Sequence, residues 1–231
     1  MSTVTIAVEA APGRVRVRSS PGVLKPMVLA RGEGWARMGL VAARALLLGG
    51  DEVRVKIGID DDCHLELVDI GGTVAYPASG LRSSWHSEIT AGERSTLCWD
   101  ALPFVVSGGA SVARSTIVRG GTGARVLLRD TLILGRSAER GGRVESFSDV
   151  RIGGRPISVE RLEADGAEPV AGVLGHHRVH DSIIAAGFRP PSSSSVLELD
   201  APGSLARWLG TQAHHSPLTA IWRRWHAILA S

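Results

Sequence analysis

Apolar and polar residues alternate along most of the first 165 positions. In residues 52–59 (EVRVKIGI) nearly every second residue is apolar, and RVRVR at 14–18 and PISVERLE at 156–163 follow a similar pattern. A period of two is that of a β-strand with one buried face. Turn signals such as GGD at 49–51 and RGGTG at 119–123 recur roughly every ten residues, so the pattern predicts about a dozen short strands before residue 165.

The pattern changes towards the C-terminus. Residues 189–196 (RPPSSSSV) indicate a loop or linker, and residues 176–188 before it are compatible with a short helix. Two amphipathic helices are then predicted by apolar residues that share a helical face. The first contains Leu205, Trp208 and Leu209, and the second begins with Ser216 as N-cap and Pro217 as first helical residue and carries Leu218, Ile221, Trp222, Trp225, Ile228 and Leu229.

Length favours a single domain over residues 1–231, with a β body (1–165) and a mixed tail (166–231) that ends in helices. The 26 basic and 23 acidic residues are spread along the chain and give a net charge of only +3. A nucleic-acid-binding chain would show a basic cluster with interleaved aromatic residues, so this class is disfavoured.

Two cysteines, Cys63 and Cys98, have no CxxC spacing, and we expect both to be small buried hydrophobes rather than part of a disulfide framework or zinc ribbon. The first residues, MSTVTIAVEA, lack the features of a secretory signal, and no segment reaches the ~20 apolar residues that cross a bilayer. We therefore expect a cytoplasmic protein that does not associate with membranes.

Signatures of common enzymes are missing from the sequence. It contains no GxSxG, GxxxxGK[ST] or HExxH motif and no GxGxxG between a strand and a helix. The glycines are those of turns.

Acidic residues at inward-facing strand positions are the main candidates for function. Asp130 shares a face with Val126, Leu128, Leu132 and Leu134. Asp51 would share a face with the apolar positions of 52–59 if that strand began at the aspartate. A buried carboxylate needs a partner, which can be an arginine, backbone donors, water or a metal ion. Taken singly, each acid fits a turn cap or a core ion pair at least as well. A third acid, Glu160, lies opposite Ile157 and Val159, so alternation alone would leave it exposed.

Histidines form a second, weaker candidate. On a helix, His176 and His180 of the motif HH-x-x-H (176–180) would lie one turn apart, a spacing that can hold a divalent ion. Without a further ligand, such pairs are more often solvated or capping residues. His214 and His215 form another pair with the same two interpretations.

The order of several motifs resembles the UreD family of urease accessory proteins, called UreH in some bacteria. The similarity covers about residues 44 to 163. The matching segments are LLLGGDEVRVKIGID (46–60), the stretch from LPF to LGR (102–136), GGRVESF (141–147), RPISVERLE (155–163) and, at the C-terminus, IWRRWHAIL (221–229).

The resemblance implies a mainly β fold of stacked, twisted sheets, similar to a β-superhelix, with two or more helices near the C-terminus. It implies a scaffold or chaperone that is not an enzyme, binds UreF, recruits the GTPase UreG through it, and docks on apo-urease as a dimer of heterocomplexes. Nickel would be bound transiently and guided to the urease active site through an internal polar passage, without a tightly held cofactor.

The same resemblance assigns roles to residues. Asp51, Asp130 and Glu160 stand at the family's acidic positions associated with the nickel passage, and Arg136 of LGR would be an ion-pair partner for a carboxylate. The helix at 221–229 would contact UreF through Trp222 and Trp225, with Arg223 and Arg224 at the rim; packing on the protein's own sheet is the alternative for the tryptophans. Residues 137–145 (SAERGGRVE) depart from the family's compact Arg-Gly-Glu.

A hydrolase of glycans remains as the alternative function. In such an enzyme two of these carboxylates would act as acid and base beside an open cleft. Aromatic platforms for sugars are scarce, because the chain has one tyrosine and three phenylalanines.

Overall fold

A computed structural model describes residues 1–43, 47–77, 80–191 and 193–229. Most of these residues lie in two β-sheets. Sheet A has seven strands in the order β14-β13-β11-β8-β5-β1-β2. They are β1 (Ser2–Glu9), β2 (Arg16–Ser20), β5 (Glu52–Ile59), β8 (Ser83–Ala91), β11 (Ser111–Gly120), β13 (Arg143–Ile152) and β14 (Arg155–Asp165).

Sheet B has ten strands within the described ranges. Eight follow the order β16-β17-β15-β12-β9-β6-β4-β3, and β10 joins β7 to β12. They are β3 (Leu24–Arg31), β4 (Trp35–Ala42), β6 (His64–Asp69), β7 (Thr73–Ala75), β9 (Thr96–Asp100), β10 (Phe104–Val106), β12 (Arg125–Leu134), β15 (Val179–Ala186), β16 (Val196–Glu198) and β17 (Gly203–Gly210).

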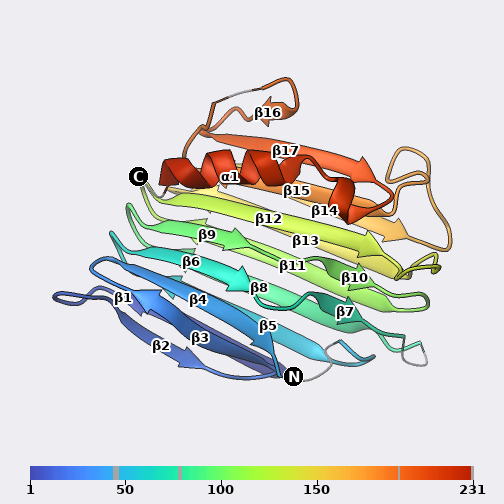
Figure 1. Ribbon diagram of the computed structural model, residues 1–231, viewed down its shortest axis with the longest axis horizontal. Helices are drawn as coiled ribbons and strands as arrows, with labels where there is room; N and C mark the ends of the chain where they lie inside the picture. The colour runs from blue at the N-terminus through green and yellow to red at the C-terminus, as the bar shows by residue number, and fades with distance from the viewer. Residues whose placement is uncertain (44–46, 78–79, 192, 230–231) are drawn as a thin grey trace.

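The chain winds between the two sheets as a coil. From β5 to β13 it passes alternately through sheet A and sheet B, so each strand pairs with the strand of the next coil, and these pairs are parallel. The colour in Figure 1 accordingly runs in order across the strands, from blue to orange. The expectation of stacked β-sheets in a superhelix-like arrangement is confirmed.

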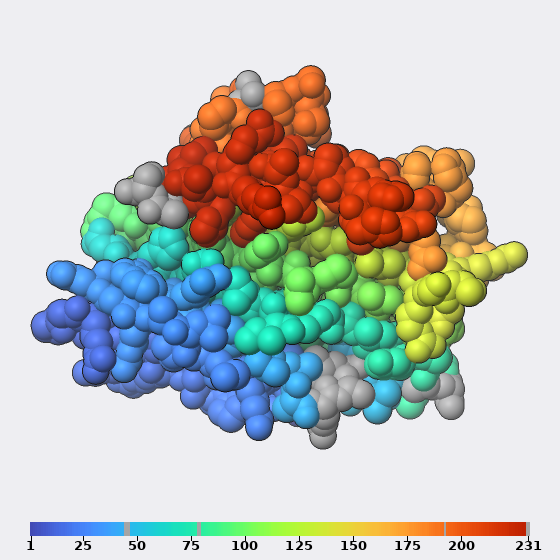
Figure 2. All heavy atoms as spheres, in the orientation of Figure 1, coloured from blue at the N-terminus to red at the C-terminus, as the bar shows by residue number. Residues whose placement is uncertain are grey.

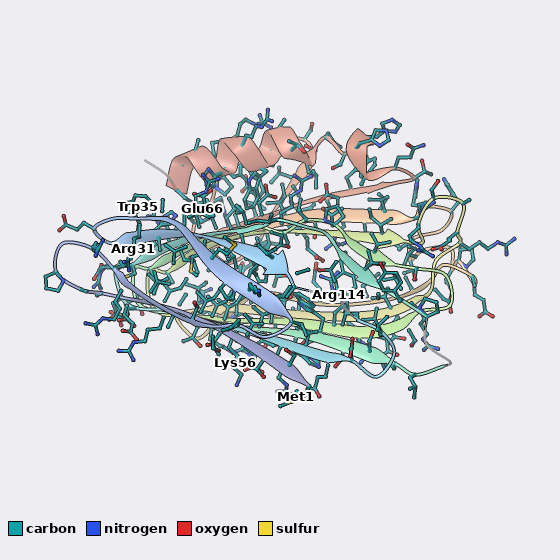
Figure 3. The ribbon with its side chains drawn as sticks, turned by 60° about the horizontal axis from the view of Figure 1, so that its bottom comes forward. Met1, Arg31, Trp35, Lys56, Glu66 and Arg114 are labelled. Atoms are coloured by element: carbon teal, nitrogen blue, oxygen red, sulfur yellow. The ribbon has the colours of Figure 1, made fainter. Side chains whose placement is uncertain are left out.

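The main hydrophobic core lies between the sheets. It takes the alternate residues of each strand, such as Val53, Val55 and Ile57 on β5 and Leu65 and Leu67 on β6, all at most 3% exposed. Figure 3 shows the two layers with side chains between them and the helix outside one layer. This arrangement explains the period of two in the sequence, because each strand turns one face to the other sheet.

One α-helix, α1 (Leu218–Leu229), covers the outer face of sheet B (Figures 1 and 2). Ser216 caps it as predicted, since its hydroxyl oxygen accepts a hydrogen bond of 3.2 Å from the Leu218 N–H. Leu218, Ile221, Trp222, Trp225 and Leu229 form a second hydrophobic cluster with residues of sheet B, among them Cys98, Leu127 and Ile183.

Two or more C-terminal helices were expected, and this expectation is wrong. Residues 203–210 form β17, and residues 179–186 form β15; the only other helical segment in the described part of the tail is the 3₁₀ turn Ala213–His215. Short apolar runs do not distinguish strand from helix by periodicity. In the structure these two segments are strands because β15 pairs with both β12 and β17.

Both cysteines are free and buried, as expected. None of the described helices has the length and apolarity to span a membrane.

Candidate functional site

A polar cavity of about 330 Å³ lies between the sheets and is called the inner cavity below. Strands β11, β13 and β14 line it from sheet A, and β12, β15 and β17 line it from sheet B. Its charged and titratable residues include Arg114, Asp130, Glu160, His180 and Arg207. Arg114 is labelled between the two layers in Figure 3. Asp130 and Glu160, which are 30 residues apart in the chain, therefore face one space.

Asp130 projects inwards from β12, as its alternation with Leu128 and Leu132 predicted. Its carboxylate forms an ion pair with Arg114 of β11, whose side chain is only 9% exposed, whereas that of Asp130 is 41% exposed. The Arg114 guanidinium also lies 4.6 Å from the ring centre of Phe104. The ring holds the cation in place, so Asp130 has a fixed positive neighbour on the opposite sheet.

Glu160 projects from β14 into the same cavity. Its two oxygens each accept a hydrogen bond of 2.8 Å from Nη2 of Arg207 on β17. Alternation left Glu160 exposed, and its side chain is indeed 42% exposed. It nevertheless lines the cavity, because β14 turns Ser158, Glu160 and Leu162 to this space and leaves Val159 52% exposed. An edge strand can expose a valine, so hydrophobicity misidentifies its inner face.

Two ion pairs cross the cavity, and the acid lies on sheet B in one pair and on sheet A in the other. Asp130 of sheet B pairs with Arg114 of sheet A, and Glu160 of sheet A pairs with Arg207 of sheet B. Arg161 also lines the cavity, so its wall carries two anions and three cations, and both anions are paired before any ligand enters.

Asp51 lies at a different place, in the turn before β5. Its carboxylate accepts a hydrogen bond of 3.0 Å from the Leu48 N–H, and its backbone carbonyl accepts one of 2.8 Å from Ser84. Asp51 does not line the inner cavity. The structure brings together only two of the three acids, and the turn-cap interpretation describes the contacts of the third.

Asp69 is an interior acid that the sequence analysis missed. It lines a smaller space of about 70 Å³, which shares Arg114 and Asp130 with the inner cavity. Burial raises the pKa of Asp69 to about 6, against the opposing effect of hydrogen bonds from Trp99 Nε1 and the Leu102 N–H. Asp69 follows Leu65 and Leu67 at alternate positions, so the signal that identified Asp130 was also present here.

The position of Arg114 could also have been predicted from the sequence. It lies at every second position with Val112, Thr116 and Val118, and these residues share the inner face of β11. Arg207 could not be found in this way, because the segment with Leu205, Trp208 and Leu209 was predicted to be a helix. Which arginine pairs with each acid depends on which strands of the two sheets face each other, and this cannot be read from the sequence.

The histidine motif at 176–180 is not helical, so the one-turn spacing does not exist. His180 lies on β15 and lines the inner cavity. His176 and His177 precede the strand, with ring centres 4.2 Å apart. No group of three or more histidine, cysteine, aspartate or glutamate side chains in the described ranges is arranged to hold a metal ion.

Arg136 of the LGR motif pairs with none of the three predicted acids. Its Nη2 lies 2.6 Å from Oε1 of Glu139, and this contact, first among several, lowers the pKa of Glu139 to about 2. Gly135 before it has φ +79°, and a Cβ there would lie 2.6 Å from the Gly141 nitrogen, which explains why the motif has glycine at this position. The departure at residues 137–145 thus supplies the partner of Arg136.

On α1 the predicted contact residues face two ways. Trp222 and Trp225 are buried against sheet B, 8% and 2% exposed, while Arg223 and Arg224 point to solvent. A buried network holds the start of the helix: Asp181 of β15, 0% exposed, accepts hydrogen bonds from Arg129, Thr131 and the cap residue Ser216. The tryptophans therefore anchor the helix, and its arginines form the outer surface.

Fold and site together define a class of protein: a coiled two-sheet β protein with its charged groups paired in an interior cavity. The sequence profile described as "UreD urease accessory protein" matches residues 13–228. The chain belongs to the UreD family of urease accessory proteins.

Known relatives agree with this membership. Urease accessory protein UreD 1 of Streptomyces griseus subsp. griseus is 39% identical over 231 residues, which cover 96% of this chain and 91% of that protein. UreD 3 of the same organism is 32% identical over 80% of this chain and 71% of its own length. UreD of Streptomyces coelicolor is 29% identical over 76% and 75%, respectively. A member of this family is an accessory protein and not an enzyme, so the alternative of a glycan hydrolase is wrong.

Proposed function

We propose that this chain is a scaffold that joins UreF and the GTPase UreG to apo-urease, and that nickel passes through its interior on the way to the urease active site. The observation that supports the passage is the meeting of Asp130 and Glu160, from opposite sheets, in one polar cavity. In this proposal nickel is cargo, and no cofactor is held permanently.

The chemistry of the cavity wall suits weak binding of a divalent cation. Carboxylate oxygens accept such ions, but a closed set of several ligands would hold the ion too long for transfer. Asp130 and Glu160 are separate oxygen ligands, each already paired with an arginine. An entering ion must compete with these guanidinium groups, which lowers its affinity. A neighbouring space, lined by Asp69 but mainly by apolar side chains, continues beyond Asp130.

Asp51 remains a predicted passage residue at a separate place. Its present contacts are those of a turn cap. In the proposed assembly, UreF contacts the solvent face of α1 with Arg223 and Arg224 at its edge, and Trp222 and Trp225 hold that helix in position. We further propose that residues 1–231 form one domain, that the complex is a dimer of heterocomplexes, and that it works in the cytoplasm.

Substitution of the cavity acids tests the passage. We expect Asp130→Asn and Glu160→Gln to leave co-purification with UreF unchanged while the nickel content and activity of co-expressed urease fall. The physical reason is that each change removes a charged oxygen ligand at nearly constant volume. Nickel per urease active site, measured by mass spectrometry of the purified enzyme, is the readout.

Asp62→Asn is the matched control, because Asp62 also pairs with an arginine, Arg94, but in an exposed turn. Asp51→Asn is measured in the same way. A lower nickel content of urease would support a passage role for Asp51, and an unchanged nickel content would support its role as a turn cap. Normal nickel loading in both cavity variants would contradict the passage, and loss of the UreF complex would assign the acids a structural role instead.

A further inference from the structure

The polar side chains of the inner cavity stand in rows across neighbouring strands. On sheet A, three residues in register on β11, β13 and β14 form one row: Thr116, Ser148 and Glu160. On sheet B, three residues in register on β12, β15 and β17 form another: Asp130, Ser182 and Arg207. Beside the first row, Arg114 of β11 is in register with Ser146 of β13, and both line the cavity. The cavity wall is therefore an ordered polar surface.

Arg114 has a hydrogen-bond donor that the protein does not use. Its side chain lies between the two layers (Figure 3) and is only 9% exposed. Nη2 donates to Asp130, whereas Nη1 is buried and has no hydrogen-bond partner among the described residues. A buried guanidinium N–H without an acceptor costs free energy, so an acceptor is the group that the site lacks. The two acids of the cavity cannot fill this place, because both are already paired.

His180 of β15 has a second buried nitrogen without a partner. Its Nδ1 forms no hydrogen bond within the part of the chain that the structure describes. Burial lowers the pKa of His180, so the ring is neutral and one of its two nitrogens carries a hydrogen. An acceptor next to Nδ1 would select the tautomer in which Nδ1 is the donor. Four hydroxyl groups of the lining can donate as well: Thr116, Ser146, Ser148 and Ser158.

The charge of the lining favours an anion as this acceptor. Three arginines line the cavity against two acids, and the imidazole of His180 interacts electrostatically with two of these arginines, Arg114 and Arg207. Arg114 also borders the smaller space of about 70 Å³, but the aromatic side chains and Asp69 there offer an anion little. Positive charge together with unused N–H and O–H donors is the combination that binds oxyanions.

We propose that the inner cavity binds a small oxyanion, a phosphate or carboxylate group, through Arg114, His180 and the hydroxyl group of Ser146. The ligand accepts the unused N–H of Arg114 and leaves the ion pair with Asp130 intact, because a guanidinium donates through several N–H groups. A cavity of about 330 Å³ holds such an ion together with several waters. The inference goes beyond the proposed function and does not depend on nickel.

Calorimetric titration of the full-length chain with inorganic phosphate at constant pH and ionic strength tests the inference. We expect one site, for which chloride does not compete. Acetate and bicarbonate are the planar alternatives, and the stronger ligand identifies the class. With ¹⁵N-labelled histidine, the bound anion should shift the ring signals of His180 and leave those of His214 and His215 unchanged; the rings of this control pair lie 4.3 Å apart in the turn before α1.

Two results of this titration would overturn the inference. The first is that none of the three anions binds. The second is that an anion binds while the ring signals of His180 stay unchanged, which would identify an adventitious ion at the surface only.

Variants supply the second measurement. Arg114→Lys and His180→Asn should each weaken anion binding roughly tenfold or more, the worth of a hydrogen bond to a charged group. Arg94→Lys should leave binding unchanged and is the matched control, because Arg94 also pairs with an aspartate, Asp62, but in an exposed turn.

The double variant His180→Asn with Ser146→Ala keeps the test decisive if Arg114→Lys fails to fold, because it leaves the ion pair of Arg114 in place. Unchanged affinity in this double variant, at an unchanged unfolding transition, would overturn the inference. The anion site and the nickel passage are separable: an oxyanion that binds while Asp130→Asn and Glu160→Gln load urease normally supports the site and contradicts the passage.

Discussion

At the scale of single residues, charge in the interior is the unusual property of this chain. Asp69, Arg114, Asp130 and Asp181 all lie at or near the inside of packed layers, and each has at least one fixed hydrogen-bond partner. A desolvated carboxylate without such contacts would be neutral at physiological pH. For Asp69, burial raises the pKa to about 6 despite these contacts.

The raised pKa of Asp69 predicts the sign of a pH effect on stability. In the unfolded chain this carboxyl titrates near 3.8 and in the folded protein at about 6, so between these values the folded state binds the extra proton. Stability should therefore fall as pH rises from about 4 to 6, by up to roughly 3 kcal/mol from this group. Urea unfolding of wild type and Asp69→Asn across this range measures the contribution, which should be absent in the variant. Equal slopes would show that Asp69 is not desolvated.

Residue patterns predicted this interior unevenly. The inward position of Asp130 followed from alternation alone, because β12 is central and strongly apolar. The same rule left Glu160 exposed, which agrees with its 42% exposed side chain, but it did not show that Glu160 faces the cavity. The reason is that β14 pairs with a strand on one side only and its outer valine pays no large penalty in water. Arg114 and Arg207 as partners depend on contacts between sheets, and no local pattern contains that information.

At the scale of elements, α1 is the part of the tail that the sequence predicted best: its cap and five of the six predicted apolar residues are as expected, whereas Ile228 is 38% exposed. Strands β15 and β17 were misassigned because their apolar residues are buried on both faces, under α1 on one side and over the core on the other. Two buried faces remove the alternation that marks a strand. Burial under α1 therefore explains why the sequences of β15 and β17 lack the pattern of a strand.

The solvent face of α1 gives a prediction about partner binding. We expect Arg223→Glu with Arg224→Glu to weaken co-purification with UreF, because two exposed cations become anions at the edge of the proposed interface, while the anchoring tryptophans remain in place. Arg31→Glu, an exposed change on β3, is the control. Full recovery of the complex with the double variant would place the UreF contact elsewhere.

At the scale of the whole molecule, two hydrophobic clusters on opposite faces of sheet B are held together by different elements. Cys63 belongs to the cluster between the sheets, and Cys98 belongs to the cluster under α1. Opening of the first requires separation of the sheets, whereas opening of the second requires only that the helix leaves. The coil and its helical cover can thus differ in stability.

Thiol labelling measures this difference. With single-cysteine variants Cys63→Ser and Cys98→Ser, we expect native protein to react slowly at either site, since both thiols are at most 2% exposed and burial raises the pKa of both. Low concentrations of urea should accelerate labelling of Cys98 before that of Cys63. Parallel acceleration at both sites would mean that helix and coil unfold as one unit.

The crossed ion pairs of the inner cavity have a consequence for any cation that visits it. When a dication takes the carboxylate of Asp130 or Glu160, it releases a tethered guanidinium that stays within reach. The bound cation repels this arginine, and the carboxylate attracts it. The arginine therefore competes with the cation for the carboxylate. In the proposed passage, the ion pair therefore re-forms once the cation has left, and the cavity returns to its starting arrangement of charges.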